Sequence, residues 1–161
     1  MISLLISSLI AIAVSGFMVG NEIAVSAFVH PKLWTLSNPT HLQAVQPLAR
    51  VYGAVMPFWY AATLLSSIWL TYHLYGLGNA IPFQLALGSS ILWLLSIVYT
   101  LWGPAPINSR VAQWDIANPP ADWQQQRRRW DRLHRWRVIG LIVAFMLVTL
   151  AGLLGVAHSG V

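Results

Sequence analysis

The sequence predicts an all-α integral membrane protein built as a bundle of four transmembrane helices. Only 8% of its 161 residues are charged and 57% are hydrophobic, whereas an ordinary soluble domain has about 25% charged residues. Four stretches are apolar over the roughly 20 residues that a membrane helix needs. The length fits a single domain, 1–161. Because the chain has no cysteine, disulfides and thiolate metal sites are excluded.

The predicted spans follow one another along the chain and cover residues 2–21, 51–74, 81–102 and 138–157. The first lacks the basic N-terminal region and cleavage site of a signal peptide, so we expect it to stay in the membrane and to continue as a mixed helix toward Val29. Asn38 and Asn118, each followed by proline, are predicted helix N-caps. The fourth helix should therefore begin near Pro120, about five turns before its span.

All nine lysine and arginine residues fall in two connections, 30–50 and 103–137. Because basic loops stay in the cytoplasm, both connections are predicted to be cytoplasmic and both termini to lie outside. The fourth helix then extends into the cytoplasm, and the protein suits the bacterial inner membrane. We expect the arginine-rich run 127–137 to fix this topology and to attract anionic headgroups by about 1 kcal/mol per charge. This placement argues against a nucleic-acid partner.

Polar residues at the predicted cytoplasmic ends of the spans are the candidates for chemistry. Trp130, His134 and Arg137 are spaced i, i+4, i+7 and share one helix face. Histidine titrates near neutrality, which suits a general base. Glu22, the only glutamate, is predicted at the same depth as Arg50 and Arg137. Since a carboxylate near hydrocarbon needs a partner, Glu22 should pair with an arginine, orient His134 or bind a metal.

A metal site is one alternative for these residues. Its candidate ligands would be Glu22, His30 and His134, which supply nitrogen and oxygen donors. No HxxxH or ExxH spacing supports such a site. The leading interpretation therefore includes no metal or other cofactor, and a metal- or haem-binding membrane protein remains the alternative.

The segment 106–138 resembles a pattern found in the anthrone oxygenase-like membrane family. In that family a Pro-x-Asn motif follows the third span, and a Trp-x-x-x-His-x-x-Arg motif opens the fourth. The matching residues are Pro106, Asn108, Trp130, His134 and Arg137. The first hairpin is also similar, at Gly20, Glu22, the run Phe28-Val29-His30-Pro31 and the pair Met56-Pro57. The named activity of the family is the oxidation of polyketide anthrones to anthraquinones with molecular oxygen.

The resemblance implies a role for each candidate residue. His134 would be the base that deprotonates an anthrone, and Arg137 or Arg50 would stabilise the resulting oxyanion. Asn108 would donate a hydrogen bond to the same oxygen, while Trp130 would offer a flat wall to an aromatic substrate.

Glu22 completes the predicted catalytic residues as the carboxylate that orients His134, and His30 joins Trp130 and Arg50 in binding substrate. The leading hypothesis is an oxidoreductase, a cofactor-independent oxygenase that acts on a lipophilic aromatic or quinone-like molecule entering from lipid. The alternative is a non-enzymatic membrane subunit or scaffold whose basic helix extension docks a partner or anionic lipid. The predicted partners are membrane lipid and a lipophilic small molecule, and a homo-oligomer remains open.

Overall fold

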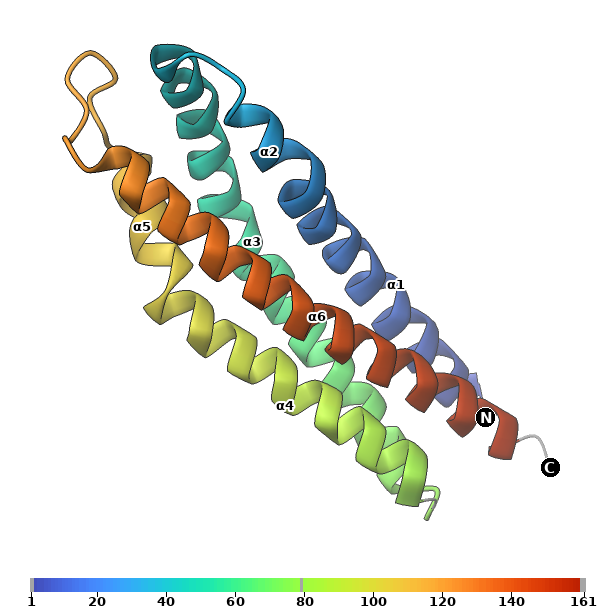
Figure 1. The fold of residues 1–161 in the computed structure, drawn as a ribbon. Coiled ribbons are helices and arrows are strands. Elements are labelled where there is room, and N and C mark those ends of the chain that lie inside the picture. Colours follow the sequence, from blue (N-terminus) through green and yellow to red (C-terminus); the bar gives the residue numbers. More distant parts are fainter. Residues whose placement is uncertain (1, 79, 160–161) are drawn as a thin grey trace.

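The computed structural model describes residues 2–78 and 80–159, and these residues form an elongated helical bundle (Figure 1). The helices are α1 (Ile2–Ala24), the π-helix η1 (Val25–Val29), α2 (His30–Leu33), α3 (Asn38–Tyr75), α4 (Ala80–Trp102), α5 (Pro104–Val111) and α6 (Trp123–Ser159). Four helical segments are long and apolar enough to cross a membrane, namely Ile2–Leu33, Asn38–Tyr75, Ala80–Trp102 and Trp123–Ser159. The predicted all-α class with four apolar membrane helices is confirmed. Positions 1, 79, 160 and 161 of the predicted domain lie outside the described residues.

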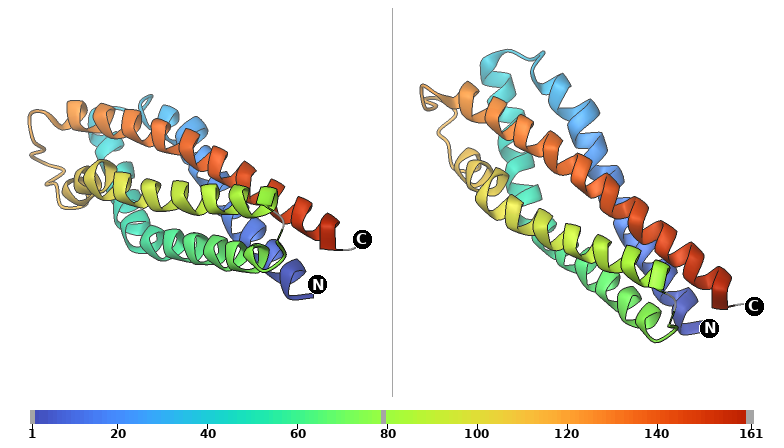
Figure 2. Two further views of the ribbon diagram at one scale, coloured as in Figure 1. Left: turned by 90° about the horizontal axis from the view of Figure 1, so that it is seen from below. Right: turned by 60° about the horizontal axis from the view of Figure 1, so that its bottom comes forward.

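The four long helices pack as a ring in which each one packs mainly against two neighbours. Helix α1 packs against α3 and α6, and α4 packs against the same two helices from the opposite side. The chain termini lie together at one end of the bundle, and α2 and α5 lie at the other (Figures 1 and 2). We call the end with α2 and α5 the basic end, because all nine lysine and arginine residues lie toward it.

The first membrane helix contains one widened turn near the basic end. In η1 the backbone N–H of His30 donates to the carbonyl oxygen of Val25, five residues earlier. Pro31 follows directly, and its ring would clash with the carbonyl group four residues before it, which favours a wider turn at this point. Val25 and His30 are both buried. The π-turn therefore turns the side chain of His30 toward the interior of the bundle.

Two helices begin at residues other than the predicted N-caps. Ser37 is the N-cap residue of α3, with an extended backbone at ψ 154°, so the cap lies one residue before Asn38. Helix α6 begins at Trp123 rather than near Pro120. Each of the two consecutive prolines disfavours helical backbone in the residue before it, so Asn118 cannot start a helix directly. The helix predicted to start at Asn38 is present, and residues 38–50 of the predicted connection are the first turns of α3.

The part of α6 that precedes the predicted span is packed against the rest of the protein. Trp123, Arg127, Trp130 and His134 are all buried. Trp130 belongs to an apolar cluster with residues from η1, α2, α3 and α5, among them Val25, Leu33, Val45, Ile107 and Val111. This segment of α6 therefore packs with η1, α2, α3 and α5 and helps to close the basic end of the bundle.

Candidate functional site

One cavity lies inside the bundle at its basic end. Its volume is about 270 Å³, close to the lower limit of pockets that bind small molecules. All seven helical elements contribute to its wall. Its polar lining residues, together with Trp130, are Glu22, His30, Tyr52, Tyr60, Thr100, Asn108, Arg127, His134 and Arg137. The structure thus brings the predicted residues Glu22, His30, Asn108, Trp130, His134 and Arg137 to one cavity.

Arg50 is the predicted site residue that lies elsewhere. It is exposed on α3, and its Nε donates to the carbonyl oxygen of Ala112 at 3.1 Å. This bond ties α3 to the end of α5. Arg50 is outside the lining of the cavity as the described residues form it, so Arg137 and Arg127 are its two guanidinium groups.

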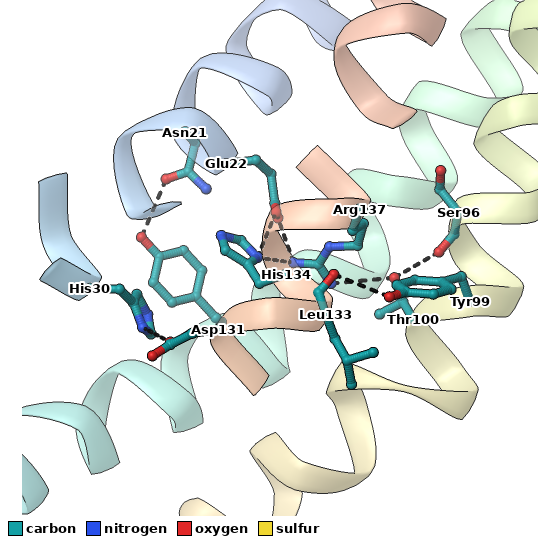
Figure 3. Close-up of polar contacts among 11 residues, drawn as sticks. Asn21, Glu22, His30, Ser96, Tyr99, Thr100, Asp131, Leu133, His134 and Arg137 are labelled. Carbon is teal, nitrogen blue, oxygen red and sulfur yellow. Dashed lines mark hydrogen bonds and ion pairs between the residues drawn. The ribbon is translucent and has the colours of Figure 1, made fainter. Parts of the chain in front are cut away.

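Glu22, His134 and Arg137 meet at the level where α6 enters its apolar stretch (Figure 3). Nη2 of Arg137 donates to Oε2 of Glu22 at 2.7 Å and also lies 2.9 Å from Nδ1 of His134. Nδ1 of His134 is 3.4 Å from the same carboxylate oxygen. All three residues are buried. The predicted pairing of Glu22 with an arginine is present: α1 supplies the carboxylate and α6 supplies the guanidinium group.

The two nitrogens of His134 have different surroundings. A guanidinium N–H can only donate, so its contact with Nδ1 assigns the lone pair to Nδ1 and the proton of a neutral ring to Nε2. Nε2 is buried and has no hydrogen-bond partner in the described part of the chain. Because His134 lines the cavity, Nε2 is the nitrogen left to meet a ligand.

A second cluster of charged residues surrounds His30. Asp131 holds two partners with its carboxylate, Nδ1 of His30 at 2.7 Å and Nε1 of Trp34 at 2.6 Å. Arg127 is almost fully buried, and its Nη2 lies 3.0 Å from Nδ1 of His30 and 3.7 Å from Asp131. A buried cation of this kind needs a nearby anion. Asp131 therefore fixes the position of both His30 and Arg127.

Trp130 connects the two clusters. Its ring stacks on His30 at a centroid distance of 4.5 Å and on His134 at 4.6 Å. The two imidazole centroids are only 6.0 Å apart. Since stacked atoms lie about 3.5 Å from a ring plane, rings on opposite faces of the indole would be farther apart than this. Both histidines therefore lie against the same face of Trp130, and that face is covered before any ligand binds.

Several cavity-lining donors have no protein partner. Among the described residues, Tyr60 Oη, Trp130 Nε1 and His134 Nε2 are buried without a hydrogen bond. Asn108 uses one N–H to donate to the carbonyl oxygen of Ala49 at 2.8 Å. Leaving a buried donor unpaired costs about 1–3 kcal/mol, and a ligand that accepts hydrogen bonds would remove this cost. The cavity therefore suits a molecule that carries oxygen acceptors.

The cavity also borders the outer surface of the bundle. Its lining includes Gly53, Pro57 and Ala61, which are spaced four residues apart on α3, and Leu101 on α4. These residues are exposed on the protein surface as well. They lie within helical segments that are apolar enough to cross a membrane. The interior is thus bounded here by small side chains that face the hydrocarbon region.

The candidate metal ligands do not form a metal site in this structure. Among the described residues no group of three or more His, Cys, Asp or Glu side chains is arranged to hold an ion. Glu22 and His134 are instead occupied by Arg137, and His30 is occupied by Asp131.

Sequence reasoning missed three residues of this site. Arg127 lies one turn before Trp130 on the same helix face, but a run of arginines next to a membrane span is expected to be solvated. Asp131 gave no local signal, because its partners His30 and Trp34 are about a hundred residues away in the sequence. Tyr60 is one of many aromatic residues in an apolar span. The packing of α2 against α6 reveals Asp131 and Arg127, and the packing of α3 against its neighbours reveals Tyr60.

The sequence model of the anthrone oxygenase family matches residues 48–147. This match covers more than half of the chain. The chain belongs to the anthrone oxygenase family. No curated protein and no solved structure matches it.

The stretch that defines the anthrone oxygenase family here includes Asn108, Trp130, His134 and Arg137. It leaves out Glu22 and His30, which reach the same cavity from α1 and α2. Membership in this family indicates an oxygenase-like activity in an integral membrane protein.

Proposed function

We propose that this protein is a membrane-embedded oxygenase that oxidises a lipophilic aromatic molecule of the anthrone or quinone-precursor class in the cavity at its basic end. One observation carries the proposal. Asn108, Trp130, His134 and Arg137 of the family pattern line a single cavity together with Glu22 and His30, and this cavity contains unpaired hydrogen-bond donors. The apolar remainder of the wall suits fused aromatic rings, and the unpaired donors suit their oxygens.

The proposed reaction consumes one molecule of oxygen for each molecule of substrate. A methylene group between two aromatic rings, next to a conjugated ketone, loses a proton and becomes an electron-rich enolate. Molecular oxygen oxidises that carbon to a second carbonyl group, and one molecule of water is released. The carbon loses two electron pairs, one to each oxygen atom: one reduced atom leaves as water, and the other becomes the new carbonyl oxygen.

His134 acts as the base through Nε2, the ring nitrogen that has no hydrogen-bond partner among the described residues. Taking up a proton there requires the ring to carry its own proton on Nδ1, where Oε2 of Glu22 can accept it. The nearby Nη2 of Arg137 opposes this tautomer in the empty site. A substrate oxyanion that draws Arg137 toward itself relieves this conflict, so substrate binding and base activation are coupled. Glu22 is a positioning residue in this scheme.

The other residues bind and orient the substrate. Tyr60 and Asn108 donate hydrogen bonds to its oxygens, and Arg137 carries the positive charge that the enolate needs. The rings enter from the bilayer past Gly53, Pro57 and Ala61, whose small side chains leave room between α3 and α4. Trp130 and His30 form the end wall. The chain lies in the bacterial inner membrane with the basic end in the cytoplasm, as the distribution of its basic residues favours.

The test is oxygen uptake and quinone formation with anthrone as the probe, on protein purified in detergent and corrected for spontaneous oxidation. We expect wild type to accelerate the reaction, and His134→Gln to lose about 10²–10⁴-fold in kcat, because glutamine can donate a hydrogen bond but cannot act as a base. Arg129→Gln, an exposed arginine outside the cavity lining, is the matched control and should keep the wild-type rate.

Two results would contradict the proposal. A His134→Gln variant within tenfold of wild type would assign His134 a donor role and remove it as the base. Wild-type protein that leaves the spontaneous rate unchanged would reject anthrone-type oxidation as its activity.

A further inference from the structure

A second cavity lies at the basic end, on the outer side of α6. Its volume is about 360 Å³. One side of its wall is α6, with Arg128, Asp131, Arg132, His134 and Arg135. The other side consists of Ser26 in η1, His30 and Pro31 in α2, and Trp34 directly after α2. It is separated from the first cavity by His30 and His134, which line both. No step of the proposed oxidation uses it.

The wall of this cavity carries an excess of positive charge. Arg128, Arg132 and Arg135 are all exposed on α6. Asp131 is the one carboxylate, and its oxygens are already occupied by His30 and Trp34. The ion pairs formed by described residues involve other arginines. Three guanidinium groups are thus free to bind an anion, and their planar donor pattern matches a phosphate group in particular.

An apolar stripe continues from these arginines along the same face of α6. Arg128, Arg132 and Arg135 are followed by Ile139, Val143, Met146 and Leu150, at spacings of four and three residues that keep one helix face. The four apolar residues are exposed on the outside of the bundle. The surface therefore offers cationic groups at one end and an apolar strip directly below them.

The boundary between the three arginines and the apolar stripe coincides with the predicted membrane interface. The predicted span of α6 begins at Val138, and Trp136 just before it is exposed, as expected for a tryptophan at the headgroup level. Trp34 lies in the wall of the second cavity, and Cζ of Arg128 is 4.5 Å from the centroid of its ring. The arginines therefore lie where lipid headgroups lie, and the stripe lies where acyl chains lie.

We propose that this second cavity binds the phosphate group of an anionic phospholipid, whose acyl chains lie along the stripe from Ile139 to Leu150. The three arginines hold the phosphate. The apolar stripe favours a lipid over a soluble phosphate ion, because it also contacts the acyl chains. The site is independent of the proposed oxidation. It confines lipid binding to one face of α6, whereas a diffuse basic surface would attract headgroups to every exposed arginine.

The experiment is native mass spectrometry of the purified protein in detergent, titrated with phosphatidylglycerol and, separately, with phosphatidylcholine. We expect tighter binding of phosphatidylglycerol and a loss of at least about tenfold in its affinity for the triple variant Arg128→Gln, Arg132→Gln, Arg135→Gln. Arg129→Gln is the matched control, because Arg129 belongs to the same arginine run but lies outside the cavity lining. It should change the affinity less than twofold.

Three outcomes would overturn the proposal. Equal losses in Arg129→Gln and in the triple variant would mean that net charge alone attracts the lipid. Equal affinities for the two lipids would mean that the arginines do not select an anion. Displacement of phosphatidylglycerol by inorganic phosphate at a similar concentration would mean that the cavity takes a soluble ion. If the triple variant has a lower unfolding temperature, the single variants Arg132→Gln and Arg135→Gln decide, since both residues are exposed.

Discussion

At the scale of single residues, Glu22 and Arg137 form a buried ion pair in the lining of the cavity. Both side chains are buried, and their 2.7 Å contact joins α1 to α6 at the basic end of the predicted spans. Arg137 also donates to Thr100 of α4 at 3.3 Å. Removing one partner of such a pair leaves a charge without compensation in a poorly solvated place, which is more costly than removing both.

A double-mutant cycle tests this coupling. We expect Glu22→Gln and Arg137→Gln each to lower the free energy of unfolding by about 3–5 kcal/mol, and the double variant to lose clearly less than the sum. Unfolding in mixed detergent micelles, followed by circular dichroism, measures all four proteins. Additive losses would mean that the two residues stabilise the bundle independently.

The sequence allowed part of this site to be predicted at the residue scale. Trp130, His134 and Arg137 could be grouped because they share one helix face, and Glu22 because its distance from the chain start sets its depth in the membrane. The position of Arg50 could not be predicted, since depth alone does not say which side of α3 faces the cavity. The contact of His30 with Asp131 depends on how α2 packs against α6, and no local pattern encodes that packing.

At the scale of elements, helices α1 and α6 approach each other closely where small residues meet. A methyl group added at Gly152 of α6 would lie 3.1 Å from Cβ of Ser8 and 3.3 Å from Cδ1 of Ile12 on α1. A methyl group added at Gly20 of α1 would have nothing within 4 Å among the described residues. Glycine is therefore needed for close packing at the first position and not at the second.

These two glycines give a matched pair of variants. Gly152→Ala should lower the unfolding temperature, because α1 and α6 must move apart to admit the methyl group. Gly20→Ala should leave it unchanged or raise it, because alanine is the better helix former and meets no neighbour. Thermal unfolding in the same detergent compares them directly. A Gly152→Ala protein as stable as wild type would show that the α1–α6 contact is looser than this.

The membrane helices themselves could be predicted well, because hydropathy and length decide which segments can cross a bilayer. The structure of the connections was harder to predict. The consecutive prolines at 119 and 120 delay the start of α6 to Trp123, and the short helix α5 lies in a stretch predicted only as a connection. Both features depend on local backbone chemistry and on packing against α3, which hydropathy does not report.

At the scale of the whole molecule, the charge is segregated along the long axis of the bundle. All basic residues lie toward the end with α2 and α5, whereas the chain termini lie at the other end (Figure 2). Both cavities are at the basic end. Substrate oxidation and lipid binding are therefore both proposed at one face of the membrane, which the positive-inside rule assigns to the cytoplasm.

Fusion reporters test this orientation. Alkaline phosphatase, which is active only outside the cytoplasm, should be active when fused to the C-terminus, and a fluorescent protein fused there should stay dark. The same two reporters inserted in the connection between α5 and α6 should give the opposite pattern. A fluorescent C-terminal fusion would place the basic end outside and contradict the assignment.

The π-turn of η1 determines which changes in residue count the geometry of the cavity can absorb. An α-helix advances by about 100° for each residue, and the turn from Val25 to Val29 accommodates one more residue than an α-turn would. Deleting a single residue there would therefore restore a regular α-turn and leave His30 facing Asp131 and Trp130. One further residue, which the widened turn has no room for, would swing His30 away from both. During evolution of the lineage, loss of one residue in this short segment should therefore be tolerated and gain of one should be rare.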